Sequence, residues 1–185
     1  MNRPVIGVDL DDVLWNFLEA WITRHNEITE DNVDVNDIKS WNIEQYIHKG
    51  SRGMLFYMLE QAGFWETVKP KDGAQLYLKK LIEDGYDVVI VTATSYKVAQ
   101  HKMMRFFELF PFIKEDQIIT AKRKQLINVD ILIDDNPDNL RGGFYNKFLF
   151  TAPHNESTNE KEIGAHRCKD WEELYHKIKK LFPIK

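Results

Sequence analysis

Cysteine is nearly absent from this chain: its 185 residues include only Cys168, so no internal disulfide can form. Such usage is typical of a reducing compartment, and we predict a cytoplasmic protein. Long hydrophobic runs are also lacking, since no stretch approaches the roughly 18 apolar residues of a membrane span, and residues 1–10 do not resemble a signal peptide. The sequence therefore excludes a disulfide scaffold and predicts no association with a membrane.

Basic tracts are equally scarce. The formal charge is −4, and the run KRK at residues 122–124 is too short for a nucleic-acid surface, so we expect no nucleic-acid polymer as a partner. The six histidines are scattered without the paired spacing of metal ligands. These absences favour a globular protein that acts on a small molecule, and they leave open whether the chain forms a homodimer.

The apolar segments that are present predict the fold class. Short runs whose apolar residues are continuous rather than alternating predict buried parallel strands at residues 5–10, 86–93, 116–120, 129–135 and 147–152. Helical patterns occupy residues 72–85, 95–111 and 169–182. Strands that alternate with helices of this length predict an α/β fold, a three-layer sandwich with a mostly parallel central sheet.

Residues 15–69 interrupt this alternation. They contain no strong strand pattern, but helical patterns at residues 14–29, 35–50 and 51–66 and four of the five tryptophans. We predict a small helical cap that is inserted after the first strand and lies at the carboxyl edge of the sheet. The core would then comprise residues 1–14 and 70–185, and the cap residues 15–69.

Three of the predicted strands end in chemically useful residues. These ends are Asp9-Leu10-Asp11-Asp12, Thr92-Ala93 and Asp134-Asp135. Ligands of open α/β sheets bind at the carboxyl ends of the strands, so carboxylates from distant parts of the sequence would meet there beside a hydroxyl group. Such carboxylates repel one another unless a cation neutralises them, and Mg²⁺ prefers hard oxygen ligands together with a substrate phosphate.

The same residues suit phosphate chemistry. Asp9, Asp134 and a backbone carbonyl would ligate Mg²⁺, while one of Asp9 and Asp11 attacks phosphorus and the other handles the leaving-group proton. The hydroxyl of Thr92 and the amide that follows it would hold phosphate oxygens. Lys124, ten residues before Asp134, supplies the missing positive charge.

The order of these motifs, D-x-D-x-V, T, K and ILIDD, resembles that of the haloacid-dehalogenase-like (HAD) phosphohydrolases. The resemblance implies a HAD-like Rossmannoid core, Mg²⁺ and a phosphoaspartate intermediate. It also implies a role for each matching residue: Asp9 as nucleophile, Asp11 as general acid/base whose carbonyl binds the metal, Thr92 as phosphate ligand, Lys124 as charge stabiliser, Asp134 as metal ligand and Asp135 as support for the metal shell.

Longer stretches, including VDLDDVLWNF, GFWETVKPKDGA and LIDDNP, narrow the resemblance to the 5'(3')-deoxyribonucleotidase family. Its members cleave phosphate from nucleoside monophosphates beneath a small helical cap. Their base-stacking aromatics most nearly match Phe17 and Trp65, whereas Trp15, Trp41 and Phe56 are weaker matches. Packing within the cap explains each of these aromatics equally well.

Two residues depart from the family pattern. Asp12 stands where many members have Gly, and we expect its backbone amide to matter more than its charge. Ala93, a further candidate for substrate contact, stands where close nucleotidases often have Ser, so the family's base and sugar preference does not carry over. His154 follows a predicted strand end near the site, where contact with substrate stays open, and we interpret it as an ordinary loop histidine in a turn.

Two alternative functions stay open. The same fold and chemistry would serve a phosphatase acting on a sugar phosphate or another small phosphomonoester. A phospho-accepting or non-catalytic phospho-binding module would use similar residue types. Receiver domains, however, have their acidic pair at the first strand and their phosphorylated Asp near mid-chain, whereas here the D-x-D motif comes first and the acidic pair late.

Overall fold

The computed structural model describes residues 3–184 and is built on a six-stranded parallel sheet. The strand order is β3-β2-β1-β4-β5-β6, and every neighbouring pair is parallel. The strands are β1 (Val5–Val8), β2 (Asp87–Thr92), β3 (Ile118–Thr120), β4 (Ile131–Asp134), β5 (Asn146–Phe150) and β6 (Ala165–Cys168). The first five confirm the predicted strands, and the parallel sheet confirms the α/β class.

The strand β6 is absent from the sequence prediction. Its residues, AHRC, include two polar side chains and lie at the edge of the sheet beside β5 alone. Only its last residue is fully buried, so the segment lacks the continuous apolar run that marks the inner strands. Its pairing with β5, from Lys147–Ala165 to Phe150–Cys168, is established by tertiary structure.

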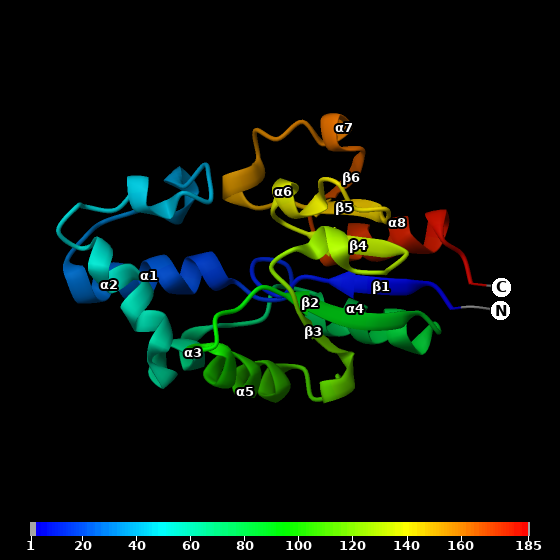
Figure 1. Cartoon of the computed structure of the whole chain (residues 1–185), viewed down its shortest axis with the longest axis horizontal. Helices are drawn as coiled ribbons and strands as arrows, with labels where there is room; N and C mark the ends of the chain where they lie inside the picture. The colour runs from blue at the N-terminus through cyan, green and yellow to red at the C-terminus, as the bar shows by residue number, and fades with distance from the viewer. Residues whose placement is uncertain (1–2, 185) are drawn as a thin grey trace.

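Helices cover both faces of the sheet, because alternate strand residues point to opposite sides. Ile6 and Val8 belong to the larger core beneath α4 (Ala74–Glu83) and α8 (Trp171–Leu181), which pack against each other. Leu132 and Leu149 belong to a smaller core beneath α6 (Pro137–Leu140) and α7 (Glu160–Ile163). Figure 1 shows these layers, with α5 (Ala99–Leu109) beside β2 and β3. The three longer helices confirm the predicted helical segments of the core.

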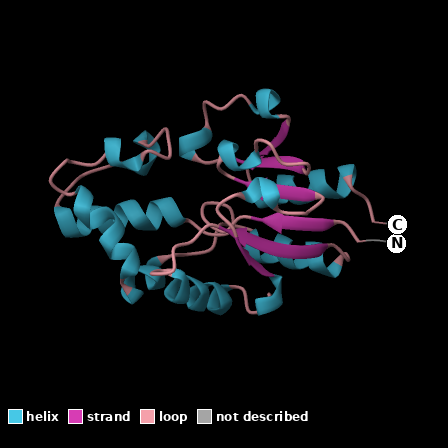
Figure 2. Cartoon of the chain, in the orientation of Figure 1, coloured by secondary structure: helices cyan, strands magenta, loops and turns pink. Residues whose placement is uncertain are grey.

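Residues 15–69, all of them described, form helices and no strand beyond isolated bridges. They comprise α1 (Phe17–Thr29), α2 (Arg52–Tyr57), α3 (Ala62–Thr67) and the 3₁₀ turns η1 (Val35–Asp37), η2 (Ile43–Gln45) and η3 (Met58–Glu60). Figure 2 shows α1, α2 and α3 beyond one end of the strands, opposite the chain termini. The division into a core domain and a cap domain stays a prediction.

The helix predicted over residues 35–50 is wrong, because only two single turns form there. The Asp34 side chain accepts a hydrogen bond from the backbone N–H of Asn36 at 2.8 Å. Short polar side chains offer the backbone such partners outside a helix, and this segment contains several Asp, Asn and Ser residues. The two ends of the insertion are bonded to each other, from Asn16 N to Lys69 O and from Lys71 N to Leu14 O, each at 2.9 Å.

Within the described residues, none of the helices combines the length and the apolar character that crossing a membrane requires.

Trp171 joins the last helix to the loop after β1, and we expect it to be a main support of the core. Its side chain is fully buried, and its indole N–H donates to the carbonyl of Val13 at 2.8 Å. Trp171→Ala should lower the free energy of unfolding by about 3–5 kcal/mol, since a large cavity forms and a buried carbonyl loses its donor. Urea denaturation followed by circular dichroism measures this loss. Leu181→Ala, on the same helix but 43% exposed, is the control; an equal loss in both variants would contradict the prediction.

Candidate active site

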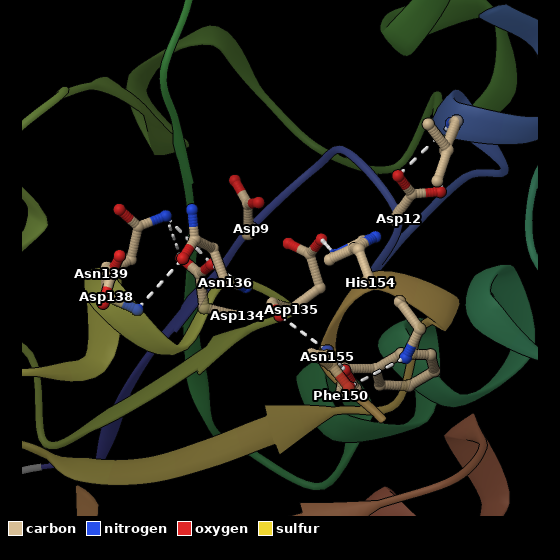
Figure 3. A network of polar contacts seen from close by, with 12 residues as sticks. Asp9, Asp12, Asp134, Asp135, Asn136, Asp138, Asn139, Phe150, His154 and Asn155 are labelled. Carbon is tan, nitrogen blue, oxygen red and sulfur yellow. Dashed lines mark hydrogen bonds and ion pairs between the residues drawn. The ribbon is translucent and has the colours of Figure 1, made fainter. Parts of the chain in front are cut away.

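Acidic and hydroxyl side chains meet at the carboxyl edge of the sheet. Asp9 follows β1, Thr92 ends β2 and Asp134 ends β4, and β1 lies between the other two strands. The backbone N–H of Asp9 donates to Ile133 O at 2.9 Å, which extends the ladder into the site. All three side chains are buried. The structure therefore brings together the strand ends that the sequence predicted as a site. Figure 3 shows the carboxylates of Asp9 and Asp134.

Lys124 lies between two of these carboxylates. It comes from the single turn η5 (Lys124–Leu126), and its Nζ lies 2.5 Å from Asp9 Oδ1 and 2.7 Å from Asp134 Oδ2. Burial alone would lower the pKa of Lys124, but the two carboxylates raise it above its ordinary value. Burial raises the pKa of Asp9 to about 7, and Lys124 opposes that rise. The lysine thus holds two buried acids together.

A second buried lysine, Lys102, holds Asp11. Its Nζ donates to Asp11 Oδ2 at 2.6 Å and to the Thr92 hydroxyl at 3.0 Å, while the indole of Trp15 donates to Asp11 Oδ1 at 2.9 Å. Lys102 is absent from the sequence prediction of the site. The available signal is its place on the apolar side of α5, one turn from the buried Phe106, where a charged residue requires a partner.

The acidic pair after β4 divides into a fully bonded and a partly bonded carboxylate. Asp134 accepts from Lys124, from Asn136 N at 2.9 Å and from Asn139 Nδ2 at 3.0 Å, so both of its oxygens are occupied. Asp135 Oδ2 is hydrogen-bonded to Nε2 of His154, whereas the buried Oδ1 of Asp135 has no partner among the described residues. Burial, followed by the neighbouring Asp134 and Asp9, raises the pKa of Asp135 well above its usual range.

Two overlapping groups of side chains can hold a metal ion, and Asp135 belongs to both. They are Asp9, Asp134 and Asp135, and Asp12, Asp135 and His154; in each group the ligand atoms lie within 4.8 Å of one another. The first group consists of three buried carboxylates, one of which has an oxygen without a partner among the described residues, and such oxygens are the hard donors that a divalent cation prefers. The residues at this edge therefore fit a divalent metal.

His154 is not the ordinary loop histidine that the sequence predicted. It lies in η6 (Pro153–Asn155), is 6% exposed, and its Nε2 lies 2.7 Å from Asp135 Oδ2. Burial, with a further contribution from Lys71, lowers the pKa of His154 to about 4. Sequence alone provides no signal for this contact, because residues 135 and 154 meet only through the pairing of β4 with β5.

Asp12 connects the acidic loop to the first helix of the insertion. Its φ of 53° lies in the left-handed region, which favours glycine and which Asp adopts more readily than most other residues. Both oxygens of its carboxylate lie 3.2 Å from the backbone N–H of Leu18, near the start of α1. Burial raises the pKa of Asp12 to about 7. We expected the backbone amide of Asp12 to matter more than its charge, but the structure shows that its carboxylate also binds the start of α1.

A cavity of about 240 Å³ opens beside Asp11 and Lys102, between the insertion and the loop after β2. Its other walls include Phe17, Phe56, Leu59, Trp65, Ala93 and Thr94. Phe17 and Trp65 are stacked on each other with ring centroids 5.9 Å apart, and both are nearly buried. Phe56, a weaker candidate from sequence, is 53% exposed and presents the most accessible ring of the three.

Comparison with known proteins gives both sequence and fold relatives. The family model described as "5' nucleotidase, deoxy (Pyrimidine), cytosolic type C protein" matches residues 3–182. A 5'(3')-deoxyribonucleotidase of Clostridium acetobutylicum is 38% identical over 94% of this chain and 93% of its own length.

Solved structures of HAD hydrolases share the fold at low identity. One from Deinococcus radiodurans, with bound phosphate and sodium, has a TM-score of 0.68 at 14% identity and covers 96% of both chains. A HAD hydrolase from Bacillus subtilis bound to magnesium has a TM-score of 0.59 at 17% identity and covers 96% of this chain and 99% of its own. These TM-scores establish a shared HAD-like fold, and at identities this low the similarity establishes the fold alone.

The buried carboxyl of Asp12 predicts a pH-dependent stability. Its pKa in the folded chain, about 7, exceeds the ordinary value of 3.8, so the folded chain binds this proton more tightly than the unfolded chain. The resulting stability is complete below about pH 4 and is lost as the pH rises through about 7. Relative to that of Asp12→Asn, the free energy of unfolding of the wild type should fall across this interval by about 1.4 kcal/mol for each unit by which the pKa differs between the folded and unfolded chains.

Urea denaturation in EDTA at several pH values measures this difference. Asp138→Asn provides the matched control, because it removes a carboxylate whose side chain is 79% exposed. A difference between wild type and Asp12→Asn that stays constant with pH would contradict the prediction.

Proposed function

Because the chain belongs to the cytosolic type C deoxy-5'-nucleotidase family, whose fold is that of the HAD hydrolases, we propose that it hydrolyses deoxyribonucleoside monophosphates to nucleosides and phosphate. The enzyme is a phosphoric monoester hydrolase. One observation carries the proposal: two carboxylates of a single loop, Asp9 and Asp11, each paired with a buried lysine, lie at the sheet edge, and Asp11 also borders an aromatic cavity.

Asp9 is the proposed nucleophile. Its carboxylate attacks phosphorus, the bond from phosphorus to the ester oxygen breaks, and Asp11 donates a proton to the departing oxygen. Asp11 then takes a proton from a water molecule, whose oxygen attacks the phosphoaspartate and releases phosphate and free Asp9. The two aspartates can hold these different roles because Lys124 binds Asp9, whereas Lys102 and Trp15 bind Asp11.

The proposed cofactor is Mg²⁺, which the carboxylates of Asp9 and Asp135 and the main-chain carbonyl of Asp11 would hold. When bound, the cation neutralises charge on the phosphoryl oxygens. The sequence predicted Asp134 as the direct metal ligand and Asp135 as its support. We propose Asp135 as the direct ligand instead, because its Oδ1 has no partner among the described residues, whereas Asp134 already accepts from Lys124 and Asn139. The magnesium bound to the Bacillus subtilis hydrolase of similar fold supports this choice of metal.

The phosphate and the nucleoside would contact different groups. Thr92, the amide of Ala93 and Lys124 would hold phosphate oxygens, and Lys102 keeps the hydroxyl of Thr92 in place. The nucleoside would occupy the cavity of about 240 Å³, with Phe56 offering the open ring for stacking and Phe17 and Trp65 forming its packed wall.

Residues 15–69 would act as a cap that excludes bulk water from the phosphate. Every group in the proposed reaction comes from one chain, so the chemistry requires neither a second subunit nor a macromolecular partner. We place the reaction in the cytosol, in agreement with the family description and with the single free cysteine.

Phosphate release from a substrate panel tests this function. In the presence of Mg²⁺, kcat/KM for deoxyribonucleoside 5'- and 3'-monophosphates should exceed that for sugar phosphates by at least roughly tenfold, the equivalent of about 1.4 kcal/mol from base contacts in the cavity. EDTA and Asp9→Asn should each abolish the release, with Asp9→Asn retaining the wild-type circular dichroism spectrum. Higher kcat/KM for sugar phosphates would exclude the nucleotide assignment, and full turnover by Asp9→Asn would exclude the nucleophile.

Lys102→Met should lower kcat about 10²-fold with a smaller effect on KM, because Asp11 and Thr92 lose their shared donor while the buried stem is retained. Steady-state kinetics on a deoxyribonucleoside monophosphate measures both constants. Lys79→Met, on the exposed side of α4, is the matched control and should retain wild-type values. A kcat of Lys102→Met within about twofold of the control would exclude this role for Lys102.

A further inference from the structure

The hydrogen bond between His154 and Asp135 is not used in the reaction proposed above, although both side chains are buried in the proposed active site. Their side chains alone are 0% and 1% exposed, and Nε2 of His154 lies 2.7 Å from Oδ2 of Asp135. Figure 3 shows the imidazole directed at the carboxylate, on the side that faces Asp12. A buried histidine in this position requires an explanation in terms of what it does to Asp135.

The hydrogen bond divides the two oxygens of Asp135 between different tasks. The carboxylate of Asp135 is ionised when it binds a cation and can then only accept, so Nε2 would carry the proton and donate to Oδ2. This contact occupies Oδ2 and leaves Oδ1, which has no partner among the described residues, available as a metal ligand. Groups that bind a ligand from outside the coordination sphere fix its orientation, and their loss typically weakens metal binding 10–100-fold.

The backbone around His154 is held firmly enough to position a ligand. The side-chain amide of the next residue, Asn155, donates to the backbone carbonyls of Asp135 at 2.6 Å and of Phe150 at 2.8 Å. Arg167 in turn donates to Asn155 Oδ1 at 3.0 Å. The turn η6 therefore binds both the backbone and the side chain of Asp135, and it connects β4, β5 and β6 at the carboxyl edge.

The insertion contacts the other side of the imidazole. The ring centroid of Trp41 lies 4.3 Å from that of His154, with the planes inclined by 45°. Close by, Lys39 of the insertion pairs with Glu156 at 2.9 Å. Trp41 Nε1, a donor, and His154 Nδ1, an acceptor when Nε2 carries the proton, are both buried without a partner among the described residues. Packing against Trp41 leaves the imidazole little freedom to rotate away from Asp135.

We propose that His154 is a positioning residue that holds Asp135 with Oδ1 directed at the divalent cation, and that Trp41 of the insertion keeps the imidazole in this orientation. The inference rests on the proposed function, since it assigns a role within the metal site of that function. It also implies that His154 acts through its hydrogen bond and is not itself a metal ligand.

Binding of Mg²⁺ alone to the full chain, without substrate, tests the proposal. Isothermal titration calorimetry should give a dissociation constant at least about 10-fold higher for His154→Ala than for the wild type. His154→Gln, whose amide can donate in place of Nε2, should bind within about threefold of the wild type, and Trp41→Ala should lie between Gln and Ala. His176→Ala, which removes an exposed histidine of α8, is the matched control and should bind as the wild type does.

Each contrary result has a distinct meaning. Wild-type affinity in His154→Ala, or equal losses in His154→Ala and His154→Gln, would overturn the positioning role, and wild-type affinity in Trp41→Ala would overturn the part assigned to the insertion. No Mg²⁺ binding by the wild type would overturn the proposed metal site and this inference together. Thermal unfolding in EDTA establishes that the variants fold; if His154→Ala does not, His154→Leu, which keeps volume without the donor, replaces it.

Discussion

Repulsion among buried carboxylates is the constraint on which the rest of this structure depends. Asp9, Asp134 and Asp135 lie at one sheet edge with at most 6% of their surface exposed, where the ionised form of each is costly. Two buried lysines offset part of this cost, Lys124 between Asp9 and Asp134 and Lys102 against Asp11. These lysines leave Oδ1 of Asp135 without a partner among the described residues. A divalent cation bound to this oxygen would neutralise the charge of the carboxylate.

The insertion at residues 15–69 is bonded to this acidic edge on two sides. On one side, Asp12 accepts from the start of α1, and Trp15 donates to Asp11. On the other, Trp41 packs on His154, which binds Asp135. Any movement of the insertion relative to the sheet therefore acts on carboxylates that the proposed chemistry uses. Such direct contacts provide a physical route by which occupancy of the cavity and order in the metal site can depend on each other.

Most of the fold follows from local patterns in the sequence. Continuous apolar runs predict five of the six strands, and amphipathic segments predict α4, α5 and α8. The failures have local causes as well: β6 is a half-polar edge strand, and residues 35–50 form single turns because short polar side chains bind their own backbone. Motif order also predicts which strand ends meet, because parallel strands place their carboxyl ends at a common edge.

The sequence by itself thus determined five of the six strands, the acidic motifs and the kind of chemistry they support. The tertiary structure decided how those groups are paired. It brought Lys102 to Asp11 over 91 residues and His154 to Asp135 over 19, and it left Phe56, rather than Phe17 or Trp65, with the open ring. The physical reason is that a strand or a motif depends on neighbouring residues, whereas a hydrogen bond between distant side chains depends on the packing of whole elements.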